Sequence, residues 1–159
     1  MGRILVAVDL SESSPLVVGR AVDLCRAMQC ELIALHVYDP DVLMQTLADS
    51  GMALDQYVDV LQADLTRIVA ATGVHGLRVR AEVIEGHRVG GAILKAADRI
   101  GADVIVVGTH GRTGVWRTLL GSVAEDVLRH ATRPVLIVPL REAAVPAPLA
   151  AGSGGEGRP

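Results

Sequence analysis

Residues 103–139 read DVIVVGTHGRTGVWRTLLGSVAEDVLRHATRPVLIVP. The opening run DVIVV is short and rich in β-branched residues, which is typical of a strand that is buried on both faces of a sheet. Gly108 ends that run, and a glycine there allows either a turn with positive φ or a close approach of the backbone to a ligand. The run VLIV at residues 135–138 predicts another strand, so this stretch is expected to form a strand, a glycine-containing loop, a helix and a strand.

The helix in this stretch has a start signal in its sequence. Ser122 and Glu125 fit the S-x-x-E capping box, and apolar residues follow at helical spacing. A capped helix start offers free N–H donors and the positive end of the helix dipole, which together favour an anion. Two interpretations of Ser122 therefore stay open: it caps its own helix, or it donates to a phosphate in the loop. Ser14 is likewise expected to cap a helix, with Pro15 at the first helical position.

Strand-like and helix-like patterns alternate along the rest of the chain. Strands are expected at residues 4–8, 32–37, 77–83, 103–107 and 135–138, and helices at 15–28, 52–72, 89–100 and 123–131. Residues 38–51 are predicted to be a polar, irregular connection. The alternation implies an α/β fold with a parallel sheet, right-handed crossovers and helices on both faces. The strands at 77–83 and 135–138 are both expected at a sheet edge, the first because it alternates apolar and charged residues and the second because prolines flank it.

The composition indicates a small single-domain protein with an aliphatic core. Half of the 159 residues are hydrophobic, none is phenylalanine, and the aromatic residues are two tyrosines and one tryptophan. The scarcity of aromatic residues and a formal net charge of -3 argue against a nucleic-acid partner. No apolar run is long enough to span a bilayer, and residues 4–8 are too short for a signal peptide, so a cytoplasmic protein without a membrane partner is expected. Cys25 and Cys30 are expected to be buried packing thiols.

Two short segments resemble nucleotide-binding motifs but lack the flanking elements or residues that such motifs require. Residues 152–157 fit G-x-G-x-x-G, but no strand precedes them and no helix follows. They belong to an Ala, Pro and Gly-rich tail, residues 141–159, which is expected to be disordered. Residues 86–91 have the glycine spacing of a P-loop without the Lys-Ser/Thr pair, so they are not a Walker motif.

The spacing Gly108-x2-Gly111-x9-Gly121-Ser122 resembles the ATP-binding subgroup of the universal stress protein family, whose pattern G-x2-G-x9-G-S/T follows the fourth strand. The resemblance extends to ILVAVDLSESS at 4–14, LHV at 35–37 and RPVLIVP at 133–139. It implies a nucleotide-binding domain over residues 1–140. The implied fold is an open five-stranded parallel sheet of strand order 3-2-1-4-5, Rossmann-like, with a crevice at the carboxyl ends of the strands.

The resemblance also implies an ATP site and the roles of its residues. Asp9 would approach the ribose or the Mg²⁺ on the phosphates, and the less favoured alternative is an Asx-type turn before Ser11. The backbone of Val37 would meet adenine. The other implied site residues are Ala7, Val107, Gly108, His110, Gly111, Gly121, Ser122 and Val123.

Three side chains of the glycine loop have two interpretations each. His110 could contact phosphate or be a loop residue without a ligand. Arg112 and Arg117 could neutralise phosphate charge or be solvated loop arginines. The doubled glycine Gly90-Gly91 departs from the commoner family form, whose helix begins with a Pro-Ala-like pair, and it leaves the start of that helix open.

Three functions remain open from the sequence. The first is an ATP-binding regulatory sensor with slow or no hydrolysis, favoured because Lys95, the only lysine, is expected in a helix away from the loop. The second is a weak ATPase or phosphotransferase assisted by His110 or Asp9. The third is a nucleotide-free scaffold that contacts other proteins. A homodimer through the strand at 134–140 and an unidentified regulatory protein partner are expected as well.

Overall fold

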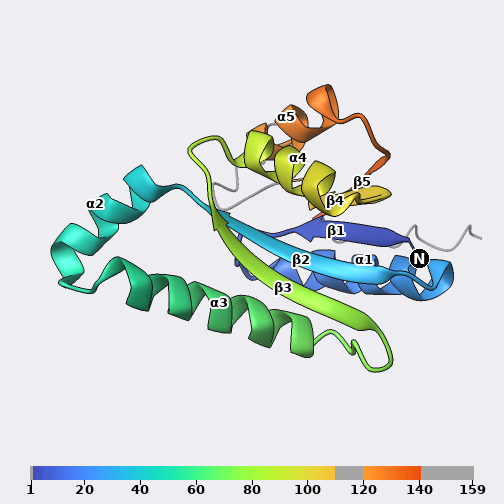
Figure 1. The fold of residues 1–159 in the computed structure, drawn as a ribbon, viewed down its shortest axis with the longest axis horizontal. Helices are drawn as coiled ribbons and strands as arrows, with labels where there is room; N and C mark the ends of the chain where they lie inside the picture. Colours follow the sequence, from blue (N-terminus) through green and yellow to red (C-terminus); the bar gives the residue numbers. More distant parts are fainter. Residues whose placement is uncertain (1, 110–119, 141–159) are drawn as a thin grey trace, which may run out of the picture.

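The computed structural model describes residues 2–109 and 120–140, which form an α/β fold around one parallel sheet (Figure 1). The sheet has five strands in the order β3-β2-β1-β4-β5, as predicted. The strands are β1 (Arg3–Ala7), β2 (Glu31–Tyr38), β3 (Arg78–Glu85), β4 (Val104–Gly108) and β5 (Val135–Val138). The helices are α1 (Ser14–Met28), α2 (Pro40–Ser50), α3 (Leu54–Ala70), α4 (Val89–Ile100) and α5 (Ser122–His130).

The core lies in two layers, one on each face of the sheet. Alternate residues of β1 face opposite ways: Ile4 and Val6 pack with α1 and α3, whereas Leu5 and Ala7 pack with α4 and α5. Figure 1 shows the same division, with α1 and α3 below the sheet and α4 and α5 above it. The buried hydrophobic side chains are aliphatic, as expected, apart from Cys25 and Cys30, which are buried free thiols.

The strand order reverses beside β1, and this is where the sheet creates a crevice. Ala7 at the end of β1 is in register with Leu35 of β2 on one side and Val107 of β4 on the other. The connections from these neighbours leave toward opposite faces, so the carboxyl ends of β1 and β4 open onto a space that neither helix layer fills.

The prediction of an irregular connection at residues 38–51 was wrong, because most of it is helix α2. Asp39 caps this helix: its Oδ1 accepts from the backbone N–H of Asp41 at 2.9 Å. Pro40 occupies the first helical position, and Gly51 ends the helix at a φ of 67°. Figure 1 places α2 beyond the carboxyl ends of the strands.

The first glycine of the doubled pair at the start of α4 allows close helix packing. A Cβ on Gly90 would lie 2.9 Å from the Cβ of Asp126 in α5, which real side chains do not tolerate. A Cβ on Gly91 would meet its nearest neighbour, the Cβ of Arg88, at an ordinary 3.8 Å. Gly90 therefore allows α4 and α5 to approach each other, whereas Gly91 has no such role.

Candidate functional site

A cavity of about 360 Å³ opens at the carboxyl ends of the strands, between the two helix layers. Eight of the ten predicted site residues line it: Ala7, Asp9, Val37, Val107, Gly108, Gly121, Ser122 and Val123. The other two, His110 and Gly111, lie outside the described residues, as do Arg112 and Arg117. The fold thus brings segments that are more than 100 residues apart in the sequence together around this cavity. That these residues bind a nucleotide stays a prediction.

Asp9 follows β1 and uses only one of its carboxylate oxygens within the turn. Its Oδ1 accepts from the backbone N–H of Ser11 at 3.0 Å and from the hydroxyl of Ser14 at 3.2 Å. Its Oδ2 is buried, and no described residue donates a hydrogen bond to it. The Asx-type turn and a ligand role are therefore compatible. A buried carboxylate oxygen without a donor is costly, and a ribose hydroxyl or a metal ion would satisfy it.

The turn that carries Asp9 is held in a special geometry. Leu10 has a φ of 61°, a left-handed conformation that is uncommon for a residue with a side chain. The buried His36 of β2 lies with its Nδ1 2.9 Å from the carbonyl oxygen of Val8. Because a carbonyl only accepts, Nδ1 carries the proton. His36 also lines the cavity. The one feature of the sequence that points to it is its position as a histidine inside an apolar strand.

Thr109 joins the ends of the glycine loop, although no sequence pattern singles it out. Its backbone N–H donates to Val138 of β5, and its carbonyl accepts from the N–H of Gly121. Its hydroxyl accepts from the N–H of Leu140 at 3.1 Å. These bonds hold the start of α5 and the end of β5 beside the end of β4.

Gly108 does not have the positive φ that was one of its two expected roles, and its missing side chain faces protein. A Cβ there would lie 3.1 Å from Leu140 Cδ1 and 3.2 Å from Val17 Cγ2. A glycine is therefore needed at this strand end because a side chain would crowd Leu140 and Val17. The backbone of Gly108 lines the cavity.

Both serine caps were predicted one residue too late. The N-cap of α5 is Gly121, so Ser122 is the first helical residue and not the cap, and Glu125 pairs with Arg129 at 2.7 Å. The N-cap of α1 is Ser13 rather than Ser14. Ser14 is free to donate to Asp9, and Ser122 lines the cavity at the start of α5, where the first N–H groups of a helix attract anions.

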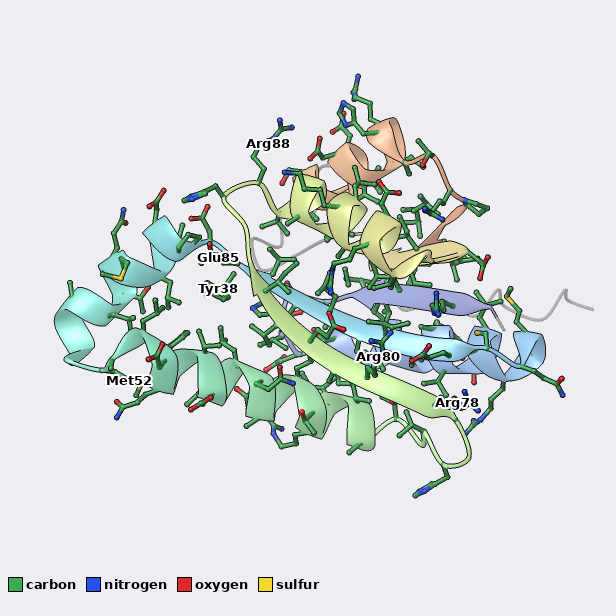
Figure 2. All side chains as sticks on the ribbon, viewed as in Figure 1. Tyr38, Met52, Arg78, Arg80, Glu85 and Arg88 are labelled. Atoms are coloured by element: carbon green, nitrogen blue, oxygen red, sulfur yellow. The ribbon has the colours of Figure 1, made fainter. Side chains whose placement is uncertain are left out.

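The part of the cavity that β2, α2 and α3 line is largely apolar and contains both tyrosines of the chain. Val37, Leu43 and Leu61 line it, together with Tyr38 and Tyr57. Figure 2 shows Tyr38 beside Glu85, its register partner on β3. Burial raises the pKa of the Tyr38 phenol, and the negative charges of Glu85 and Asp55 raise it further. The cavity therefore joins a polar end, with Asp9 and the start of α5, to an apolar end.

The universal stress protein family model matches residues 1–139. This chain belongs to that family. Universal stress protein MJ0531 from Methanocaldococcus jannaschii is 30% identical over 138 residues, covering 86% of this chain and 81% of the relative. The solved structure of protein MJ0577 from the same organism matches with a TM-score of 0.75 at 25% identity, over 89% of this chain and 98% of that one. A universal stress protein solved in complex with cAMP matches with a TM-score of 0.63 at 28% identity, over 87% and 96% of the two chains.

A second polar group lies at the rim of the cavity in this universal stress protein. Asp39, Asp41 and His87 each place one possible metal-ligand atom within 4.8 Å of the others. His87 Nδ1 lies 3.1 Å from Asp41 Oδ2, and Asp39 Oδ1 caps α2. A helix cap and a hydrogen bond between α2 and the β3–α4 connection account for this arrangement. Within the described part of the chain, no helix combines the length and apolarity needed to cross a membrane.

Proposed function

We propose that this universal stress protein binds an adenine nucleotide in the cavity at the carboxyl ends of β1 and β4. The observation that carries the proposal is the buried Oδ2 of Asp9, which has no hydrogen-bond donor among the described residues and belongs to a cavity-lining side chain. The start of α5 suits the phosphates, and the apolar end suits the base. The related protein solved with cAMP lends support.

The nucleotide we propose is ATP with Mg²⁺. Carboxylate oxygens are preferred Mg²⁺ ligands, and Asp9 Oδ2 is free to serve either the metal or a ribose hydroxyl. The backbone of Val37 would meet adenine at the end of β2. Gly108, Gly121, Ser122 and Val123, with His110 and Gly111 of the loop, would surround the ribose and phosphates.

We further propose a cytoplasmic regulatory sensor that hydrolyses ATP slowly or not at all. Fast phosphoryl transfer uses a lysine or arginine to stabilise the transferring phosphate. Of the described residues that line the cavity, none is a lysine or an arginine. Lys95 lies within α4 and lines a separate groove on the β3 side of the sheet. Nucleotide occupancy would then control contact with a regulatory protein partner.

The test is equilibrium dialysis with Mg-ATP, beside a Gly121→Asp, Ser122→Glu double variant that places negative charge at the start of α5. We expect the wild type to bind, the variant to lose binding while folded, and the recovered ATP to be intact. A Gln29→Glu variant adds charge at the opposite end of the sheet and should bind normally. A wild type without bound nucleotide and without a nucleotide-dependent rise in melting temperature would refute the proposal in favour of a scaffold. Many turnovers per second would favour an ATPase.

We also propose a homodimer through residues 134–140. β5 is an edge strand that pairs only with β4 among the described strands, and Leu136 on it is 38% exposed. An edge with unpaired backbone groups and an exposed apolar side chain favours pairing with a second copy.

A further inference from the structure

Both tyrosines of this chain lie at one site. The chain has no phenylalanine, one tryptophan and two tyrosines, and both tyrosines line the cavity. Tyr38 stands at the end of β2, and Tyr57 is in the first turn of α3. An aliphatic core elsewhere shows that packing in this fold does not depend on aromatic rings. Core packing therefore does not account for an aromatic residue at position 57, and its contact with the cavity is the feature to consider.

Tyr57 extends the inward-facing stripe of α3 past the end of the core. Leu61 and Leu65, one and two turns later on the same face, are both buried. Tyr57 is only half-buried, because at its level the cavity takes the place of the core. Its side chain thus points in the direction of the stripe but meets the cavity.

The first turn of α3 lies close to the end of β2. Asp55, two residues before Tyr57, is near enough for its charge to act on the Tyr38 phenol. Val37, the residue proposed to meet adenine through its backbone, directly precedes Tyr38 and lines the same apolar end. Val89 and Ile93 of α4 line the cavity from the other helix layer. A flat base at the end of β2 would therefore have Tyr57 on one side and the aliphatic residues of α4 on the other.

We infer that Tyr57 stacks on the base of the bound nucleotide and is a specificity-determining residue of this site, an inference that rests on the proposed function. The π face of an aromatic ring stacks on a nucleobase whatever the base's hydrogen-bonding edge. Tyr57 thus strengthens binding of any ligand that carries a base and contributes nothing to a ligand that is only a sugar phosphate.

The experiment is calorimetric titration of the full chain with AMP and with ribose 5-phosphate, which lacks the base. Tyr57→Ala should weaken AMP binding by about tenfold, the scale of one lost base–aromatic stack, and leave ribose 5-phosphate binding unchanged. Tyr57→Phe keeps the ring and should stay within about twofold of the wild type. Tyr57→Leu fills much of the volume without a π face and should resemble Tyr57→Ala. Val60→Ala, at a residue 47% exposed on the same helix, is the control.

The outcomes separate this inference from the proposed function. If the wild type binds AMP and Tyr57→Ala binds it equally well, the stacking role is wrong while the nucleotide site stands. Equal loss of AMP and ribose 5-phosphate by both Tyr57→Ala and Tyr57→Leu would mean that Tyr57 only supports the fold, and it would overturn the inference as well. A wild type that binds neither ligand would refute the site itself. Melting curves of each variant show that it is folded.

Discussion

Ser14 donates its hydroxyl hydrogen to Oδ1 of Asp9 at 3.2 Å, which ties the first residue of α1 to the carboxylate that follows β1. The N–H of Ser11 donates to the same oxygen, so the needs of the turn are met by Oδ1. The second oxygen, Oδ2, is buried and has no donor among the described residues. The local sequence thus fixes one oxygen and leaves the other for a ligand.

Asp9→Asn separates these two functions of the carboxylate. The amide oxygen can replace Oδ1 in the turn, but the amide NH2 group cannot bind a metal or accept from a ribose hydroxyl. We expect the affinity for Mg-ATP to fall about tenfold, as when one charged hydrogen-bond partner is lost, while the melting temperature changes little. Ser14→Ala is the control: it should lower the free energy of unfolding by about 1 kcal/mol and keep most of the affinity. Unchanged Mg-ATP binding by Asp9→Asn would remove Asp9 from the site.

The fold was largely predictable from sequence, and the reason lies in the strands. β-branched runs such as residues 104–107 bury both faces and leave little choice of structure. The strand order came from the family resemblance, because alternation of strands and helices is compatible with several orders. Helix α2 was missed although Asp39, Pro40 and Gly51 are ordinary start and stop signals. Residues 38–51 also have the polar character of a loop, which conflicts with those signals.

The site residues that belong to a short sequence motif were predictable. Those whose contribution depends on hydrogen bonds to residues distant in the sequence were not. Asp9 and the glycines belong to local patterns. The contributions of Thr109 and His36 depend on hydrogen bonds to Val138 and Val8, which lie about 30 residues away along the chain and are adjacent only once the sheet forms. The two caps were misplaced by one residue, since a pair such as Ser13-Ser14 does not reveal which member precedes the first helical turn.

Gly90 and Gly91 offer a matched test of close helix packing. Gly90→Ala places a methyl group against Asp126, and we expect the free energy of unfolding to fall by about 1–3 kcal/mol, as in overpacked cores. Gly91→Ala adds the same methyl group where the nearest atom is 3.8 Å away, and higher helix propensity should stabilise the protein by up to about 1 kcal/mol. Urea denaturation of both variants measures the difference. Equal effects of the two substitutions would contradict the packing role of Gly90.

Gln29 ends α1 in a left-handed conformation with a φ of 52°. Its N–H donates to Arg26 and the N–H of Cys30 to Cys25, the two bonds of a Schellman motif, in which glycine is the preferred residue at this position. Because Gln29 is exposed, Gln29→Gly loses little packing, and we expect a gain of about 0.5–1 kcal/mol in the free energy of unfolding. Gln29→Ala, which keeps the Cβ, should show no such gain. Thermal unfolding that places both variants at the wild-type midpoint would argue against strain at this turn.

Burial of Cys25 predicts a loss of stability at alkaline pH. Desolvation, with a contribution from the Cys30 thiol, raises the pKa of Cys25 from 9.0 to about 12. The unfolded chain then loses the thiol proton first, so this stabilisation is complete below pH 9 and disappears as the pH rises toward 12. At pH 10 the loss is about 1 kcal/mol. Urea denaturation under reducing conditions at pH 8, 9 and 10 should show the decline, and Cys25→Ala should make it shallower. An identical slope in Cys25→Ala would assign the decline to other groups, among them Tyr38, whose pKa is also raised.

Leu136 provides the test of the proposed dimer, because it is an exposed apolar residue on the edge strand β5. Pairing two copies of β5 would bring the two Leu136 side chains into the interface, where a lysine would place two positive charges close together. We expect the wild type to have the mass of a dimer by light scattering at micromolar concentration and Leu136→Lys that of a monomer. Leu16→Lys, at a comparably exposed leucine of α1, should stay dimeric. A monomeric wild type would refute the dimer, and a dimeric Leu136→Lys would place the interface on another surface.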